Sequence, residues 1–396
     1  MKKSLLFSAV IAFISIETSK AQVVYFPDMN FKLALIQNHN IDTNFDWEIQ
    51  FSEAAAYSDS IFLGYHNITD ATGIEAFTSI SRLTIIYNYN LTNLNVSANS
   101  NLTYLNCRGN GITSLNISGT TALDSLYCDN NLITSLDASA HPNLTFLNCY
   151  ANDIASLNLS GTTALKSIHC GSNELGSLDV SGSIDLTFLA CFDNLLTSLD
   201  VSANTALTHL NCSYNIFDSL NVSSNTALTM LEAGSTYLKS LDVSANTALT
   251  SLNCTHSSQL TSLNVKNGNN INFNLFEANY NPNLSCIQVD DAGWSQINWP
   301  APTSIDSSAY FNEICSVGLN NLTINDKVVS YPNPTTGSIF LSNNFNATIT
   351  DLYGIVVSTK ENTKQLDLSS YPTGMYFISL TDNKGQMIYR SKVMKE

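Results

Sequence analysis

The chain has 396 residues, and its 32 acidic residues against 16 basic ones give a formal net charge of −16. Only 12% of the residues are charged, and Lys and Arg form no visible cluster. An acidic surface repels phosphate backbones, so the composition argues against nucleic acid as a partner.

The N-terminus has the features of a secretory signal peptide. Two lysines precede an apolar run from Leu5 to Ile16, and Ser19 and Ala21 supply the small residues of a cleavage site. The run is too short to span a bilayer, which disfavours a transmembrane anchor. No cysteine precedes Cys107, which disfavours a lipid anchor. We therefore expect residues 1–21 to be removed on export.

Residues 22–80 differ in composition from the centre of the chain and are predicted to form a small helical N-terminal cap. Helices are expected at Phe31–Ile36 and from Ser52, and the segment between them resembles a 12-residue EF-hand loop. The calcium ligands that this resemblance implies are Asp42, Asn44, Asp46, Glu48 and Glu53. Trp47 replaces the usual glycine, which weakens the case for Ca²⁺. The alternative is a loop held by Asx turns without a metal.

A period of 21 residues dominates positions 81–285. One position of the repeat, here called the slot, recurs every 21 residues and holds Cys107, Cys128, Cys149, Cys170, Cys191, Cys212, Ala233 and Cys254. A leucine recurs five positions before each slot, from Leu102 to Leu249. An asparagine recurs three positions after most slots, from Asn110 to Asn215.

Two architectures are compatible with a period of 21, a coiled coil and a solenoid of strands. Abundant Asn, Ser, Thr and Gly disfavour helix interiors. Apolar and polar residues alternate at Leu105–Cys107 and again at Leu115–Ile117, as in short strands. We therefore expect two extended segments per coil and parallel stacking of the coils.

The spacing Leu102-x-x-Leu105-x-Cys107-x-x-Asn110-x-Ile112 resembles the signature of leucine-rich repeats. The short period also resembles repeats of secreted Bacteroidetes proteins. The resemblance implies a mainly β leucine-rich-repeat solenoid whose asparagines bond the backbone of the turn and connect one coil to the next.

The nine cysteines are predicted to fall into two groups. Side chains on neighbouring parallel strands lie about 4.8 Å apart, which exceeds the Cβ spacing of a disulfide, roughly 3.8 Å. The seven cysteines in the slots should therefore be reduced and buried. A single column also lacks the geometry of a zinc site.

Cys286 and Cys315 lie outside the period and enclose a region with two tryptophans. A solenoid needs a polar cap over its end, and residues 286–317 resemble the start of such a cap in the same repeat proteins. We expect the two cysteines to form a disulfide.

Residues 325–396 are predicted to form a small β-sandwich of short strands separated by Gly and Pro turns. Five motifs within them resemble the type A sorting domain of the type IX secretion system: Tyr331–Pro334, Asp351–Gly354, Leu366–Leu368, Tyr371–Tyr376 and Lys392–Lys395. The resemblance implies passage across the outer membrane of a Gram-negative bacterium by the type IX machinery, followed by release or attachment at the cell surface. A generic adhesion module is the alternative.

Outward residues of the repeated strands should line the concave face of the solenoid. His169 is expected on this face too. The predicted ligand-binding residues are Tyr104, Tyr127, Phe146, Tyr150, Phe188, Phe192, His209 and Tyr214. Rings beside amides suit an extracellular protein or a polysaccharide. A structural surface protein without a specific ligand is the alternative.

Catalysis is not expected. The six histidines are scattered, and none has a nucleophile or a carboxylate at a motif spacing. Neither a phosphate-binding loop nor an HExxH helix occurs.

Overall fold

The computed structural model describes residues 22–315, 330–381 and 387–396, so the predicted signal peptide lies outside the described residues. The chain divides into two compact units, with the boundary between Cys315 and Ser316.

The first unit opens with the predicted helical cap. It contains α1 (Met29–His39), α2 (Phe51–Ala56) and the short 3-10 helix η1 (Ile74–Ala76). Helix α1 begins where it does because the Asp28 carboxylate accepts a hydrogen bond from the Phe31 N–H. The other oxygen of Asp28 accepts the N–H and the hydroxyl of Thr69, which attaches the helix to the first coil.

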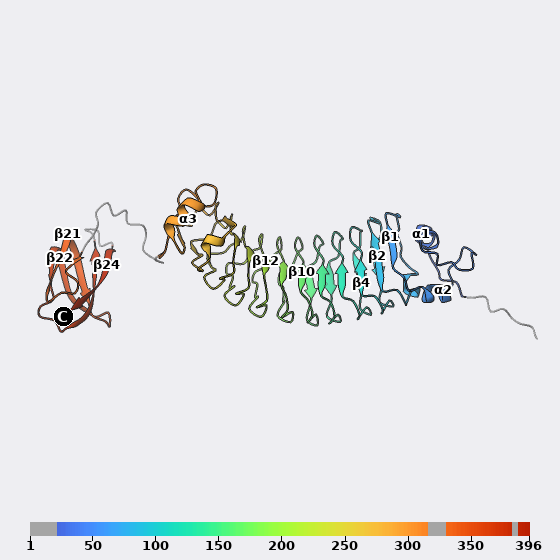
Figure 1. Ribbon diagram of the computed structural model, residues 1–396, viewed down its shortest axis with the longest axis horizontal. Helices are drawn as coiled ribbons and strands as arrows, with labels where there is room; N and C mark the ends of the chain where they lie inside the picture. Colours follow the sequence, from blue (N-terminus) through green and yellow to red (C-terminus); the bar gives the residue numbers. More distant parts are fainter. Residues whose placement is uncertain (1–21, 316–329, 382–386) are drawn as a thin grey trace, which may run out of the picture. The chain divides into compact units, whose positions relative to one another are not determined.

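Coils lie side by side along the rest of this unit (Figure 1). One strand of each coil joins a parallel sheet of eleven strands. In spatial order the strands are β1 (Ile61–Gly64), β2 (Arg82–Ile86), β4 (Tyr104–Asn106), β6 (Ser125–Tyr127), β8 (Phe146–Asn148), β10 (Ser167–His169), β11 (Phe188–Ala190), β12 (His209–Asn211), β13 (Met230–Glu232), β15 (Ser251–Asn253) and β17 (Leu275–Glu277). Leu105 pairs with Leu126 and Leu126 with Leu147, so the register advances by one repeat per strand.

Shorter parallel sheets occupy the return side of the coils, as the second alternating segment predicts. They pair β3 (Asn93–Asn95) with β5 (Ser114–Asn116), β7 (Ser135–Asp137) with β9 (Ser156–Asn158), and join β14 (Ser240–Asp242), β16 (Ser262–Asn264), β18 (Cys286–Gln288) and β19 (Tyr310–Asn312) in that order. The 3-10 helix η2 (Asn270–Asn272) precedes β17.

The core between the two sides is continuous. The column of leucines five positions before each slot, from Leu102 to Leu249, and all seven slot cysteines are fully buried, and those cysteines are free thiols. No single coil could enclose these side chains, so each coil relies on its neighbours for burial.

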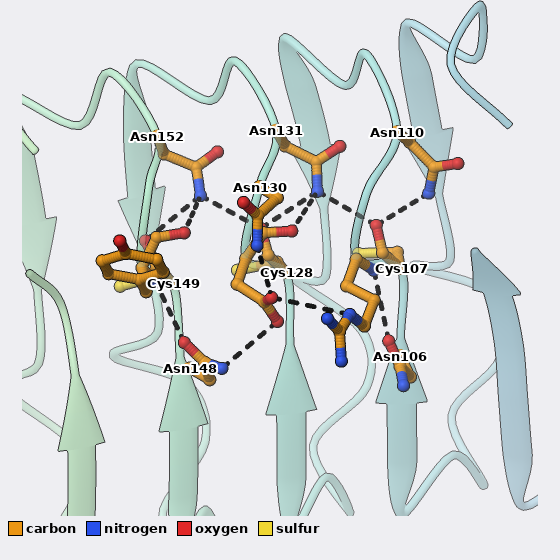
Figure 2. A network of polar contacts seen from close by, with 12 residues as sticks. Asn106, Cys107, Asn110, Cys128, Asn130, Asn131, Asn148, Cys149 and Asn152 are labelled. Carbon is orange, nitrogen blue, oxygen red and sulfur yellow. Dashed lines mark hydrogen bonds and ion pairs between the residues drawn. The ribbon is translucent and has the colours of Figure 1, made fainter. Parts of the chain in front are cut away.

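The asparagine three positions after most slots connects successive coils (Figure 2). The Asn131 amide group donates to the carbonyl oxygens of Cys128 in its own coil and Cys107 in the preceding one, both at 3.0 Å. Its carbonyl oxygen accepts the N–H of Ile112 at 3.1 Å. Asn152, Asn173, Asn194 and Asn215 repeat this arrangement. The predicted link between coils is therefore confirmed.

A second buried polar column was not predicted. It consists of Asn99, Thr120, His141, Thr162, Ser183, Asn204, Asn225, Asn246 and Asn267. Asn204, for example, donates to the carbonyl oxygens of Val180 and Ser183 in the preceding coil. The 21-residue spacing of these residues is the signal that could have found the column.

The solenoid ends in a cap built from helix α3 (Ala292–Asn298), β18 and β19. Trp299 is buried and stacks on Phe276, with ring centroids 4.2 Å apart. Cys286 and Cys315 form a disulfide with a Cα–Cα distance of 5.9 Å.

The second unit is an antiparallel β structure. Its strands are β20 (Ser330–Tyr331), β21 (Ser338–Thr350), β22 (Val356–Asp367), β23 (Gly374–Thr381) and β24 (Met387–Lys395). Hydrogen bonds join these strands into an antiparallel sheet, as expected for the predicted C-terminal β domain. The long strand β21 connects the sheet, because β20, β22 and β23 all pair with it. Ile339, Leu366 and Ile378 lie in the core of this unit.

Candidate ligand-binding face

Strand alternation decides which side chains reach the outer face of the eleven-stranded sheet, here called the sheet face. In β4, Leu105 points into the core and is fully buried, whereas Tyr104 and Asn106 on either side are half-buried. The same pattern recurs in β6, β8, β10 and β12. The sheet face is therefore made of the first and third residues of each strand.

Six rings on the sheet face touch one another in an unbroken line, here called the ring row. Neighbouring ring centroids are 4.5 to 5.9 Å apart. The members are, in order, Tyr104, Tyr127, Phe146, His169, Phe188 and His209. Each aromatic contact stabilises the fold by about 0.5–1.5 kcal/mol, so the ring row is held rigidly as well as displayed.

His169 completes the ring row, although it was not among the predicted ligand-binding residues. It comes from the third position of β10 and lies between Phe146 and Phe188, which come from the first positions of β8 and β11. A search for rings at only one strand position across the coils therefore misses His169. Burial lowers the pKa of His169, although the carboxylate of Asp129 opposes the shift, so the environment favours the neutral ring.

A second group of rings lies just beyond the ends of the strands. Tyr150 and Phe192 have centroids 5.8 Å apart and enclose a cavity of about 250 Å³ with His169 and Gly171. A Cβ at position 171 would stand 2.7 Å from the Phe192 ring, so only glycine leaves room for it. The cavity joins the ring row to these outer rings.

Tyr214 borders a neighbouring cavity of about 270 Å³ that shares Phe192 with the first one. Its side chain is 62% exposed. Glu232 lines the same cavity. The structure thus brings all eight predicted ligand-binding residues to one continuous surface, partly as the ring row and partly as the borders of two cavities.

Charge is distributed unevenly along the sheet face. The Arg82 guanidinium lies 4.0 Å from the centre of the Tyr104 ring, and Arg108 pairs with Asp129 at 3.6 Å. Toward the other end, the carboxylates of Glu232 and Glu277 accept hydrogen bonds from the amides of Asn211 and Asn253. The N-terminal end of the face therefore carries the cation of Arg82 beside the neutralising Arg108–Asp129 pair, and the C-terminal end carries the two carboxylates.

At Trp47, the EF-hand-like loop has the left-handed backbone that the usual glycine would adopt, but the Asp42 and Glu53 carboxylates are already bonded within the loop. Trp47 is left-handed, with φ of 64°, and its N–H donates to Asp42. Both Glu53 oxygens accept hydrogen bonds, from Thr43 and from the Gln50 N–H. Burial raises the pKa of Glu53, but these hydrogen bonds outweigh it and lower the pKa. Calcium binding would require Glu53 to exchange these partners for the ion.

The described residues contain no group of three or more His, Cys, Asp or Glu side chains arranged to hold a metal. The slot cysteines are poor nucleophiles, because burial raises the pKa of Cys212 and of Cys254 to about 12. Within the same described part, no helix is long and apolar enough to cross a bilayer.

Comparison with solved structures finds similar leucine-rich-repeat folds. The functional domain of InlJ from Listeria monocytogenes, which includes a cysteine ladder, is 22% identical over 95% of this chain and 100% of its own length, with a TM-score of 0.42. The internalin InlF from Listeria monocytogenes is 16% identical over 67% of this chain and 95% of its own, with a TM-score of 0.32. YopM from Yersinia enterocolitica is 18% identical over 58% of this chain and 59% of its own, with a TM-score of 0.42.

Family comparisons identify two parts of the chain. Residues 100–141 match leucine-rich repeats in two copies, and residues 329–396 match the secretion system C-terminal sorting domain. A comparison with curated proteins gives no match. The chain therefore carries a leucine-rich-repeat solenoid followed by a type IX sorting domain, which marks it for export to the cell surface or beyond.

Proposed function

We propose that this chain is an exported recognition protein that binds an extended extracellular protein along the sheet face. The observation that carries the proposal is the ring row, six aromatic or imidazole rings in mutual contact across six successive strands. Surfaces of this composition are typical of recognition sites.

Two features favour a protein over a neutral polysaccharide. Three of the five contacts in the ring row are stacked, so part of these ring faces is covered by a neighbouring ring and is not free to stack on a sugar. The opposite charges at the two ends would orient a ligand of complementary charge. The fold is one that typically binds rather than catalyses, which agrees with the scattered histidines.

An array of extracellular proteins and glycans, probed with the exported chain, tests the proposal. The informative variant replaces Tyr150 and Phe192 with alanine, because these rings border a cavity and do not belong to the ring row. Tyr237→Ala is the matched control, since Tyr237 is an exposed tyrosine outside the ring row and both cavities.

The double variant should bind its protein target about thirtyfold more weakly, the loss typical of a central aromatic anchor, while Tyr237→Ala should bind normally. If the chain bound only glycans, the proposal of a protein ligand would be wrong and the ligand would be a glycan. Equal binding by the wild type and the double variant would contradict a site that extends from the ring row into the adjoining cavity and would favour a structural role.

A further inference from the structure

The last coil of the solenoid has a strand on one side only. On the return side, β16, β18 and β19 follow one another in a continuous sheet. Between β16 and β18, the chain forms β17, the last strand of the eleven-stranded sheet. Between β18 and β19, where the next strand of that sheet would follow, the chain forms α3 and a loop instead. In the described residues, the β-bridge between this loop and the sheet joins Ile305 to Ala278, just beyond the end of β17.

Strand β17 consequently presents an edge to which no neighbouring strand is bonded. Asn274, Phe276 and Ala278 occupy positions of the repeat whose main-chain groups, in earlier coils, form hydrogen bonds with the next strand. At the position that corresponds to Ala278, for instance, the Cys107 N–H donates to the Tyr127 carbonyl. At the edge of β17, the Ala278 N–H donates to the Ser304 carbonyl at 2.7 Å. Among the described residues, the N–H and C=O of Phe276 have no such partner, because β17 pairs with β15 alone.

A cavity of about 460 Å³ lies at this place. One wall is the strand itself, from Asn274 to Glu277, and the opposite wall is formed by Trp294, Asn298 and Trp299 of the cap. The side chain of Phe276 packs against Trp299 in the core, with centroids 4.2 Å apart. Main-chain groups in extended conformation and aromatic side chains thus border the same space.

We infer that this cavity binds a short extended peptide, which adds to β17 as a parallel strand and completes the sheet. Only a polypeptide offers alternating N–H and C=O groups at the spacing of the strand edge, and addition of a strand to an exposed edge is a common mode of peptide recognition. The site is separate from the ring row and would bind whether or not the sheet face has a ligand.

The side chains of the cavity also indicate the sequence of the peptide. A residue beside Glu277 in the added strand would point outward, next to the Glu277 carboxylate, and should be Lys or Arg. The residue before or after it would point inward, toward Trp294 and Trp299, and should be apolar. The expected ligand alternates basic and apolar residues.

A hexapeptide library with Lys or Arg at alternate positions, screened against the exported chain, provides the test. Each selected peptide is then methylated at one backbone nitrogen at a time. In a parallel strand, alternate N–H groups face the partner, so affinity should fall about tenfold at alternate positions and stay unchanged between them. Peptide binding should also slow hydrogen exchange of the Phe276 amide.

Glu277→Gln keeps an acceptor for the Asn253 amide and should weaken binding of the basic peptides while leaving the melting temperature unchanged. The Tyr150→Ala, Phe192→Ala variant should bind these peptides normally, which separates this site from the sheet face. The inference is overturned if no peptide is selected, if methylation at every position has the same effect, or if glycans rather than peptides bind at the tryptophans.

Discussion

Replacing Asn131 with alanine tests the hydrogen-bonded column that connects the coils. The substitution leaves the Ile112 N–H, which Asn131 accepts at 3.1 Å, without a partner in a buried position. The carbonyl oxygens of Cys107 and Cys128 each lose one bond but keep another, from Asn110 and Asn152 respectively. An orphaned buried donor costs about 1–3 kcal/mol, and each lost second bond about 0.5–1.5 kcal/mol. The free energy of unfolding should therefore fall by about 2–6 kcal/mol.

Urea unfolding followed by circular dichroism measures this loss, and hydrogen exchange shows where it acts. The Ile112 amide should exchange much faster in the variant, while amides of distant coils such as Leu252 keep their protection. Asn143→Ala is the matched control, because Asn143 is exposed and donates only one bond of 3.4 Å. If both variants lost the same stability, the column would not connect the coils energetically.

Four further predictions concern other parts of the chain. A bulky thiol reagent should leave the slot cysteines unmodified in the folded protein and label them in urea, because burial raises their pKa; rapid labelling without urea would contradict the buried column. Replacing Cys286 and Cys315 together by serine should lower the free energy of unfolding by about 3 kcal/mol, given a sequence separation of 29 residues, and unchanged resistance of the cap to proteolysis would argue against this. Burial raises the pKa of Asp28, but hydrogen bonds from Thr69, Phe31 and Asp70 outweigh burial and lower the pKa from 3.8. The stabilisation by this carboxylate is therefore complete above the pKa of the unfolded state and is lost as the pH falls through the pKa of the folded state. Acidification below pH 4 should consequently destabilise the wild type more than Asp28→Asn. Calcium should raise the melting temperature only at about 10⁻⁴–10⁻³ M or above, and Trp47→Gly should strengthen the effect; no response to Ca²⁺ in either protein would remove the EF-hand proposal.

The solenoid could be predicted because its sequence repeats with one period. Once Leu105 and Cys107 are assigned inward, the same assignment holds 21 residues later, and the parallel register follows. The role of Asn131 was predictable from the resemblance to leucine-rich repeats, and it agrees with the need of a buried polar residue for partners at each recurrence.

The ring row could be predicted only in part, because it depends on contacts between different columns. Tyr127 and His169 come from third positions, and Phe146 and Phe188 from first positions, so no single column contains the row. Side-chain torsions bring the rings together, and those are set by the neighbouring coil rather than by local sequence. The incomplete last coil escaped prediction because residues 286–317 have no repeat with which to be compared.

The constant length of the coils from β4 to β15 has a consequence for how such a chain can vary. Insertion or deletion of one whole 21-residue unit would leave every other strand in register. It would lengthen or shorten the sheet by one strand spacing, about 4.8 Å. A unit inserted without a ring between β8 and β10 would nevertheless separate Phe146 from His169 and divide the row into two shorter platforms. Duplication of DNA in steps of one unit could therefore alter the reach of the molecule while leaving its stability almost constant.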